Sequence, residues 1–143
     1  MIWIRLGLPV LAALIFTLPV CSQVKGAAEA RASAAFAEVL LRKTELLADA
    51  ESLAESYTDT NPKMVDLRYE VAALDRYLTR ITHAQPADMS KLTLALGKLM
   101  VRRAALDTEL SRLSRSVNID HPDHKRAKKR LEVFDAAIKE IFP

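Results

Sequence analysis

Cysteine, glycine and aromatic residues are scarce in this 143-residue chain, and each scarcity excludes a class of protein. The one cysteine, Cys21, excludes a disulfide scaffold, and three glycines provide no glycine-rich loop for a nucleotide phosphate. Aromatic residues make up 6% of the chain, and no run of alternating β-branched residues predicts a strand. Because half of the residues are hydrophobic, a core can form, and we predict an all-α fold.

The first 22 residues have the pattern of a signal peptide. A short basic start precedes an apolar run over residues 6–20, which is long enough for a signal-peptide core and short for a transmembrane span. Cleavage after Ser22 would leave a mature helical domain of residues 23–143. Two alternatives stay open: Cys21 ends a lipobox-like sequence that would make a lipoprotein, and residues 2–20 could form an uncleaved membrane anchor. All three interpretations place the domain in the periplasm or outside the cell.

The domain contains the same helical pattern twice, with a spacing of sixty residues. In each copy, residues of matching kinds recur every three or four positions, which is the period of one helix face. Matching pairs include Val39 and Leu99, Lys43 and Arg103, Leu46 and Leu106, Leu53 and Leu113, Pro62 and Pro122, and Leu74 and Phe134. We therefore predict a tandem duplication of a helical hairpin, over residues 27–83 and 87–142. Its four helices, near 27–57, 62–83, 87–117 and 122–142, would form a four-helix bundle or a short coiled-coil rod.

Each hairpin is predicted to turn just before a proline. Pro62 and Pro122 suit the first position of a helix, where the missing N–H costs nothing, and they disfavour helix at the preceding residue. The segments before them are so short that the chain must reverse direction, which predicts antiparallel helix pairs.

The first of these turns carries a resemblance to a known family. The stretch over residues 57–74, with Tyr57, Asn61 and Pro62, resembles the turn in the periplasmic coiled coil of Wzz- and GumC-like polysaccharide co-polymerases. A Tyr-x-Asp-x-His-Pro sequence opens the returning helix in that family, and the second copy here keeps His121 before its proline. The resemblance implies a coiled-coil element of the cell envelope rather than a complete co-polymerase.

One cation interrupts the apolar face of the first helix in each copy, at Lys43 and Arg103. In an antiparallel hairpin these positions fall opposite residues 76 and 136, next to Asp75 and Asp135. We predict that Lys43 pairs with Asp75 and Arg103 with Asp135, and that the pairs fix the register of the hairpins. The alternative is that each cation extends to water and that the aspartates are solvated.

Two histidines and two aspartates lie close together before the last helix. Asp120, His121, Asp123 and His124 are residue types that bind zinc or copper, which makes them weak metal candidates. The same residue types are favoured at helix starts through capping and the helix dipole. His124 also occupies the core position that Met64 has in the first copy, so we expect no metal site here.

A basic run follows, formed by Lys125, Arg126, Lys128, Lys129 and Arg130. The corresponding residues of the first copy have mixed charges, so the hairpin itself does not require this run. Such a surface could attract lipid head groups, an acidic glycan or an acidic partner helix. No aromatic platform accompanies it, so we do not expect nucleic acid as a partner. The alternative is an ordinary solvated helix face.

Catalytic motifs are absent from the sequence. There is no nucleophile elbow, and the serines lie in helical runs without a paired histidine, so we expect neither an enzyme nor a cofactor. The pattern favours a non-catalytic scaffold or adaptor that binds an envelope protein or itself through helical faces. Membrane contact is expected only through the N-terminal segment. The alternative is a periplasmic ligand-binding module that binds an anion or metal through residues 121–130.

Overall fold

The computed structural model describes residues 20–143, and this part of the chain is all-helical, as predicted. Residues 1–19 of the predicted signal segment lie outside the described residues, and its last three residues, 20–22, begin the first helix. None of the described helices is both long and apolar enough to cross a membrane. The elements in order are α1 (Val20–Arg31), α2 (Ala34–Ala54), α3 (Pro62–Thr82), the 3₁₀ helix η1 (Pro86–Lys91), α4 (Leu94–Ser116) and α5 (Pro122–Ile141).

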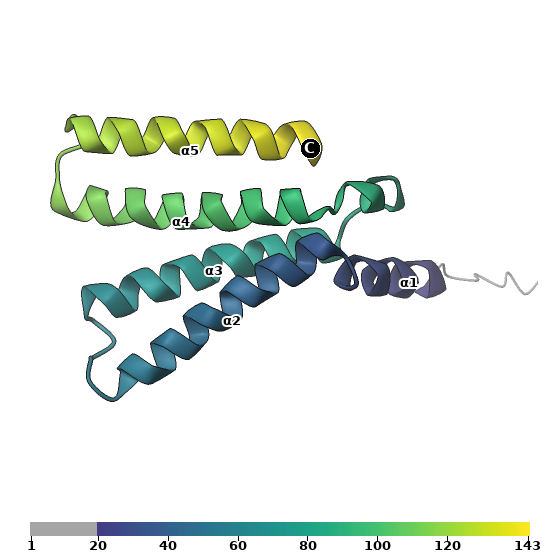
Figure 1. The fold of residues 1–143 in the computed structure, drawn as a ribbon, viewed down its shortest axis with the longest axis horizontal. Coiled ribbons are helices and arrows are strands. Elements are labelled where there is room, and N and C mark those ends of the chain that lie inside the picture. Colours follow the sequence, from purple (N-terminus) through teal and green to yellow (C-terminus); the bar gives the residue numbers. More distant parts are fainter. Residues whose placement is uncertain (1–19) are drawn as a thin grey trace, which may run out of the picture.

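Helices α3 and α5 both begin at a proline, as predicted from the sequence. The Asn61 side chain accepts a 2.9 Å hydrogen bond from the Lys63 N–H, and His121 Nδ1 accepts one of 3.2 Å from the Asp123 N–H. These caps satisfy N–H groups that a helix start leaves unpaired. The chain reverses at both places, so that α2–α3 and α4–α5 are antiparallel hairpins (Figure 1).

The first and third predicted helices, over residues 27–57 and 87–117, are each broken near their start, so this prediction was wrong. The Ser33 and Thr93 hydroxyls cap α2 and α4 by accepting hydrogen bonds of 3.2 and 3.3 Å from the N–H three residues later. A hydroxyl at this position competes with continuation of the helix. The breaks separate α1 from α2 and η1 from α4, and their spacing is again sixty residues.

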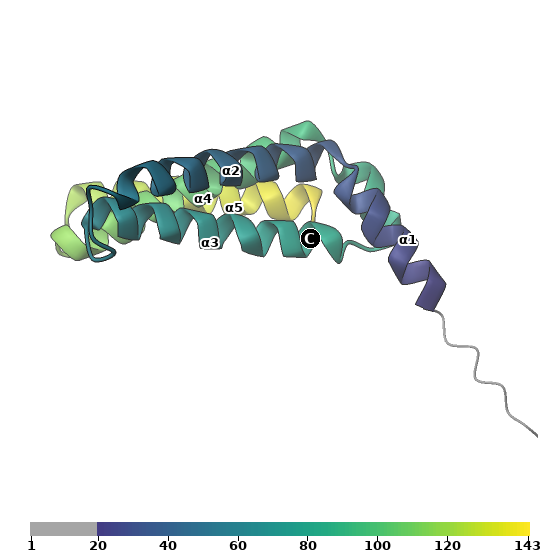
Figure 2. The same cartoon turned by 90° about the horizontal axis from the view of Figure 1, so that it is seen from below.

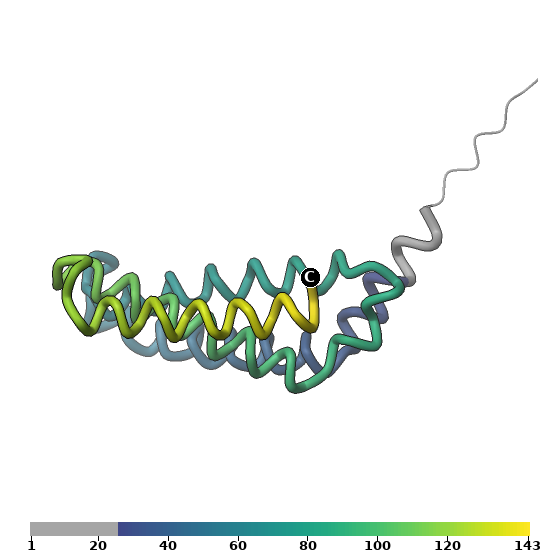
Figure 3. Tube along the Cα trace, turned by 90° about the horizontal axis from the view of Figure 1, so that it is seen from above, coloured from purple at the N-terminus to yellow at the C-terminus, as the bar shows by residue number. Residues whose placement is uncertain are grey.

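Helix α4 lies at the centre of the arrangement. It packs against α2, α3 and α5, whereas α5 packs mainly against α4. In Figure 1 the helices form a stack with α2 at one edge and α5 at the other, and Figure 2 shows α4 and α5 behind α2 and α3. Both hairpin turns lie at the same end of the molecule, which can be followed along the tube in Figure 3.

The main core lies between the two hairpins, away from their turns. Gly97 brings α4 unusually close to α2, because a Cβ there would lie 2.9 Å from Glu38 Cβ and 3.0 Å from Ala35 Cα. Leu74 is fully buried in this core, but Phe134 at the matching position is half-buried, since α5 packs mainly against one helix. The largest fully buried side chains are Leu74, Ile81, Leu96, Met100, Leu106 and Val39.

Candidate functional site

The structure brings together both charge pairs that the sequence predicts. Lys43 Nζ lies 2.6 Å from Asp75 Oδ1, which links α2 to α3. Arg103 uses two nitrogens, with Nε donating to Asp135 Oδ1 at 2.9 Å and Nη2 to Oδ2 at 3.4 Å, which links α4 to α5. Each pair therefore joins the two helices of one hairpin at equivalent positions.

The Arg103 pair belongs to a larger polar cluster that sequence analysis missed. Arg103 Nη1 also donates to Asp107 Oδ2 at 3.1 Å, and Arg76 of α3 approaches the same oxygen to 4.0 Å. The only sequence signal for Asp107 was its spacing of four residues from Arg103, which places both on one helix face. Burial favours a lower pKa for Arg103, but the hydrogen bond to Asp135 and the nearby charges raise that pKa overall, so the cation is maintained.

Tyr77 lies buried beside this cluster, and its titration provides a test of the packing. Burial raises the pKa of the Tyr77 hydroxyl above its ordinary value of 10.0. The unfolded chain therefore releases this proton at a lower pH than the folded chain does, and the free energy of unfolding should fall as pH rises above 10. We expect Tyr77→Phe to lose stability less steeply than the parent in urea titrations between pH 9 and 11. Equal slopes would contradict a buried Tyr77.

A second ion pair that sequence analysis missed lies between α2 and α3. Arg42 Nε donates to Glu70 Oε1 at 3.1 Å, and Glu70 is buried. Burial favours a lower Arg42 pKa, but the charge and hydrogen bond of Glu70 raise it overall, so the Arg42 cation is maintained. This contact, like that of Lys43 with Asp75, lies within the first hairpin and links its two helices.

The weak metal candidates do not gather into one site. His124 is buried, with Nε2 3.1 Å from Ser114 Oγ, and His121 caps α5. Asp120 and Asp123 pair with neighbouring cations instead. Among residues 20–143, no group of three His, Cys, Asp or Glu side chains is arranged to hold a metal ion.

The basic run lies exposed on the first half of α5. Four of its five cations have a carboxylate within 4.0 Å, and Lys128 has none among the described residues. The pairs are Lys125 with Asp120, Arg126 with Asp123, Lys129 with Glu132, and Arg130 with Glu109. These exposed contacts are worth little individually, so the cations can exchange them for another partner.

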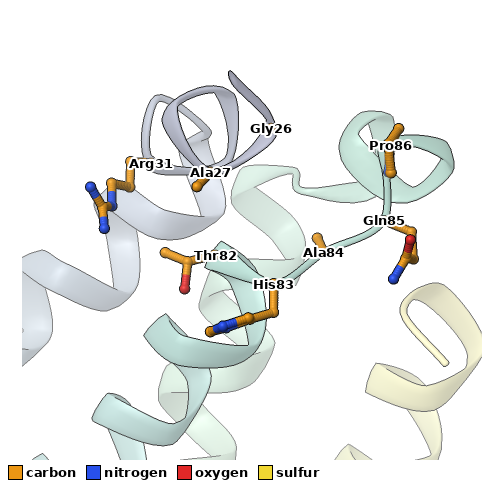
Figure 4. A pocket seen from close by; sticks show the side chains of 8 residues that line it. All are labelled: Gly26, Ala27, Arg31, Thr82, His83, Ala84, Gln85 and Pro86. Atoms are coloured by element: carbon orange, nitrogen blue, oxygen red, sulfur yellow. The ribbon is translucent and has the colours of Figure 1, made fainter. Parts of the chain in front are cut away.

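A cavity of about 560 Å³ lies between α1 and the segment after α3 (Figure 4). Its polar side chains are those of Arg31, Thr82, His83 and Gln85; Thr82 is half-buried and the other three are exposed. His83 Nδ1 is already 2.8 Å from the Thr79 carbonyl oxygen. None of the polar side chains that line this cavity is buried.

Helix α2 has an exposed apolar face that sequence analysis missed, because it assigned only one apolar face, directed to the core, to each helix. Leu40, Leu41 and Leu47 are 42%, 57% and 48% exposed. They lie with Ala37, Thr44 and Ala48 on one side of the helix, and we name these six residues the α2 outer face. All six are exposed, whereas the residues sixty positions later are buried or half-buried in α4: Gly97, Met100, Val101, Ala104, Asp107 and Thr108.

Comparison of the chain with protein families, curated proteins and solved structures finds no match. The resemblance of the first turn to the co-polymerase coiled coil therefore stays a prediction.

Proposed function

We propose that this chain is a non-catalytic helical scaffold, made of two duplicated hairpins stacked as a bundle, that binds protein through the α2 outer face. One observation carries the proposal. The face that is covered in α4 by the rest of the chain is open in α2, although it keeps the apolar residues that suit a covered position. A contiguous apolar surface on a soluble domain is typical of a protein-binding site.

Three further observations support the duplication within this proposal. The starts of α2 and α4, and those of α3 and α5, are each sixty residues apart. The capping hydroxyls of Ser33 and Thr93 have that spacing too. The ion pairs that join the two helices of each hairpin, Lys43–Asp75 and Arg103–Asp135, are also sixty residues apart. One ancestral hairpin, repeated, explains all of these matches with a single event.

The sequence of the N-terminal segment supports a setting in the cell envelope. We propose that a signal peptide or anchor directs the chain to the cell envelope, where its partner is an envelope protein or the chain itself. The ligand-binding alternative has less support, because four of the five basic side chains already have carboxylate partners and the histidines serve packing and capping.

A photoreactive amino acid in place of Leu47 tests this function in the cell that makes the chain. We expect light to produce a covalent adduct with one protein of defined mass. The matched control is Val65, an exposed apolar residue of α3 whose counterpart, Lys125, is exposed as well. Absence of an adduct at position 47, or equal adducts at 47 and 65, would overturn the proposal.

A further inference from the structure

We infer that the protein bound by the α2 outer face is a second copy of this chain. The inference rests on the proposed duplication and deepens the proposed function. Within one chain, the first helix of the second hairpin, α4, packs against both helices of the first hairpin. The same contact between chains would place α2 of one copy against α4 and α5 of another.

The surface that would receive α2 is exposed on α5. One side of α3 contacts α4 through Asp66 and Arg76. Ala73 lies on the same side, seven residues after Asp66, and so does Tyr77, four residues after Ala73. Ala73 and Tyr77 are buried there. The matching residue of Ala73 is Val133 of α5, which is 60% exposed and is, after Ile119, the most exposed large apolar side chain of the described residues.

The ion pairs that cross between the hairpins predict matched contacts between copies. Arg115 of α4 donates to Asp66 of α3. Their counterparts are Glu55 and Arg126, so both charges are reversed and the attraction between them is kept.

A second ion pair between the hairpins is replaced at both of its matching positions. Asp107 of α4 approaches Arg76 of α3. The counterparts are Leu47 and Ala136, both exposed, so a charged pair inside the chain corresponds to an apolar pair between copies. Substitution of only one partner would have left an unpaired charge in the contact.

Charge along the helices agrees with the same register. The second half of α2 carries Glu45, Asp49 and Glu51, Glu55 follows the helix directly, and no lysine or arginine occurs from residue 44 to residue 62. In the inferred contact this half lies along the first half of α5, where the basic run is located. Within this run Arg126 lies in the contact, because its counterpart Asp66 contacts α4, so the contact gives this cation an acidic helix as its partner.

The contact is heterologous, because its two surfaces differ. In a pair of copies, one copy keeps a free α4–α5 surface and the other a free α2 outer face, so the assembly extends as a filament or closes as a ring. Ala37 takes the place of Gly97 in this contact, and its Cβ requires the copies to lie slightly farther apart there than the two hairpins of one chain.

Sedimentation velocity over a concentration series tests the inference on the chain as isolated from its cells, in a mild detergent that solubilises any retained N-terminal segment. We expect the mass to increase with concentration beyond that of a dimer, or to reach a closed ring. Glu55→Arg and Arg126→Glu should each weaken self-association about tenfold, since each places like charges opposite each other. An equal mixture of the two variants should restore it, because every contact then joins opposite charges.

Matched controls change the same charges outside the contact. Glu132→Arg and Lys129→Glu are exposed on α5, and the counterparts of both positions are exposed in α3, so neither should weaken association. A complementary pair, Leu47→Asp with Ala136→Arg, rebuilds the Asp107–Arg76 contact between copies and should associate better than Leu47→Asp alone.

Two results would overturn the inference. One is a monomer at every concentration, and the other is a closed dimer that Glu55→Arg weakens while Arg126→Glu leaves it unchanged. A monomer whose position 47 still forms adducts with a different protein in the cell would reject the second copy and keep the proposed function. A monomer without such adducts would reject both.

Discussion

Leu74→Asp is expected to lower the free energy of unfolding by about 4 kcal/mol or more, and Phe134→Asp by about 1–2 kcal/mol. Leu74 is fully buried, so the new carboxylate would have neither water nor a cation within the core. Phe134 is half-buried on α5, where a carboxylate reaches solvent. Urea unfolding followed by circular dichroism at 222 nm measures both variants.

The matched control for this comparison is Leu74→Met, which nearly conserves volume and should cost less than about 1.5 kcal/mol. A Leu74→Asp variant as stable as the parent would show that the hairpins do not pack through α3 as described. Equal decreases in the free energy of unfolding for Leu74→Asp and Phe134→Asp would show that α5 is covered on its outer side even when the chain is dilute.

Arg103→Ala is expected to cost about 2 kcal/mol, and more than Lys43→Ala, because it removes the cation shared by two carboxylates. The Arg103 and Asp135 side chains are 21% and 38% exposed and meet through two nitrogens, whereas those of Lys43 and Asp75 are 24% and 51% exposed and meet through one. Double-mutant cycles should therefore give a coupling of about 1 kcal/mol for Arg103 with Asp135 and at most about 0.5 kcal/mol for Lys43 with Asp75.

Salt provides the control for these couplings. Because exposed pairs are screened more than half-buried ones, 1 M NaCl should remove most of the Lys43–Asp75 coupling and less of the Arg103–Asp135 coupling. Arg103→Lys separates charge from geometry, since lysine keeps the charge and loses the two-nitrogen contact. No coupling in either hairpin would contradict the antiparallel register.

Local chemistry explains which parts of the fold could be predicted from sequence. The starts of α3 and α5 were predictable because a proline restricts both its own backbone and the residue before it. Both hairpin pairs followed from counting residues away from the turns, since an antiparallel pair has one register once its turn is known. The breaks at Ser33 and Thr93 were missed, because helical periodicity continues through them and only hydroxyl capping interrupts it.

The candidate interface could not be found from the pattern of residues alone. Leu40, Leu41 and Leu47 lie beside the core-facing stripe, and scattered leucines on a helix are common at protein surfaces. Their importance appears only once α4 is known to be covered at the matching positions. In the same way, the contact of Asp107 with Arg76 depends on how one hairpin lies across the other, which is a tertiary property.

In the inferred assembly, the α2 outer face and the exposed surface of α5 are covered by the same contact between copies. Hydroxyl-radical footprinting over a concentration series tests it directly, since it reports the solvent exposure of individual side chains. Leu40, Leu47 and Val133 should react in the dilute chain and become protected together as concentration rises, while Ile119, exposed in the second turn, stays reactive throughout. Unchanged reactivity of the three residues, or protection of α2 without Val133, would contradict the account.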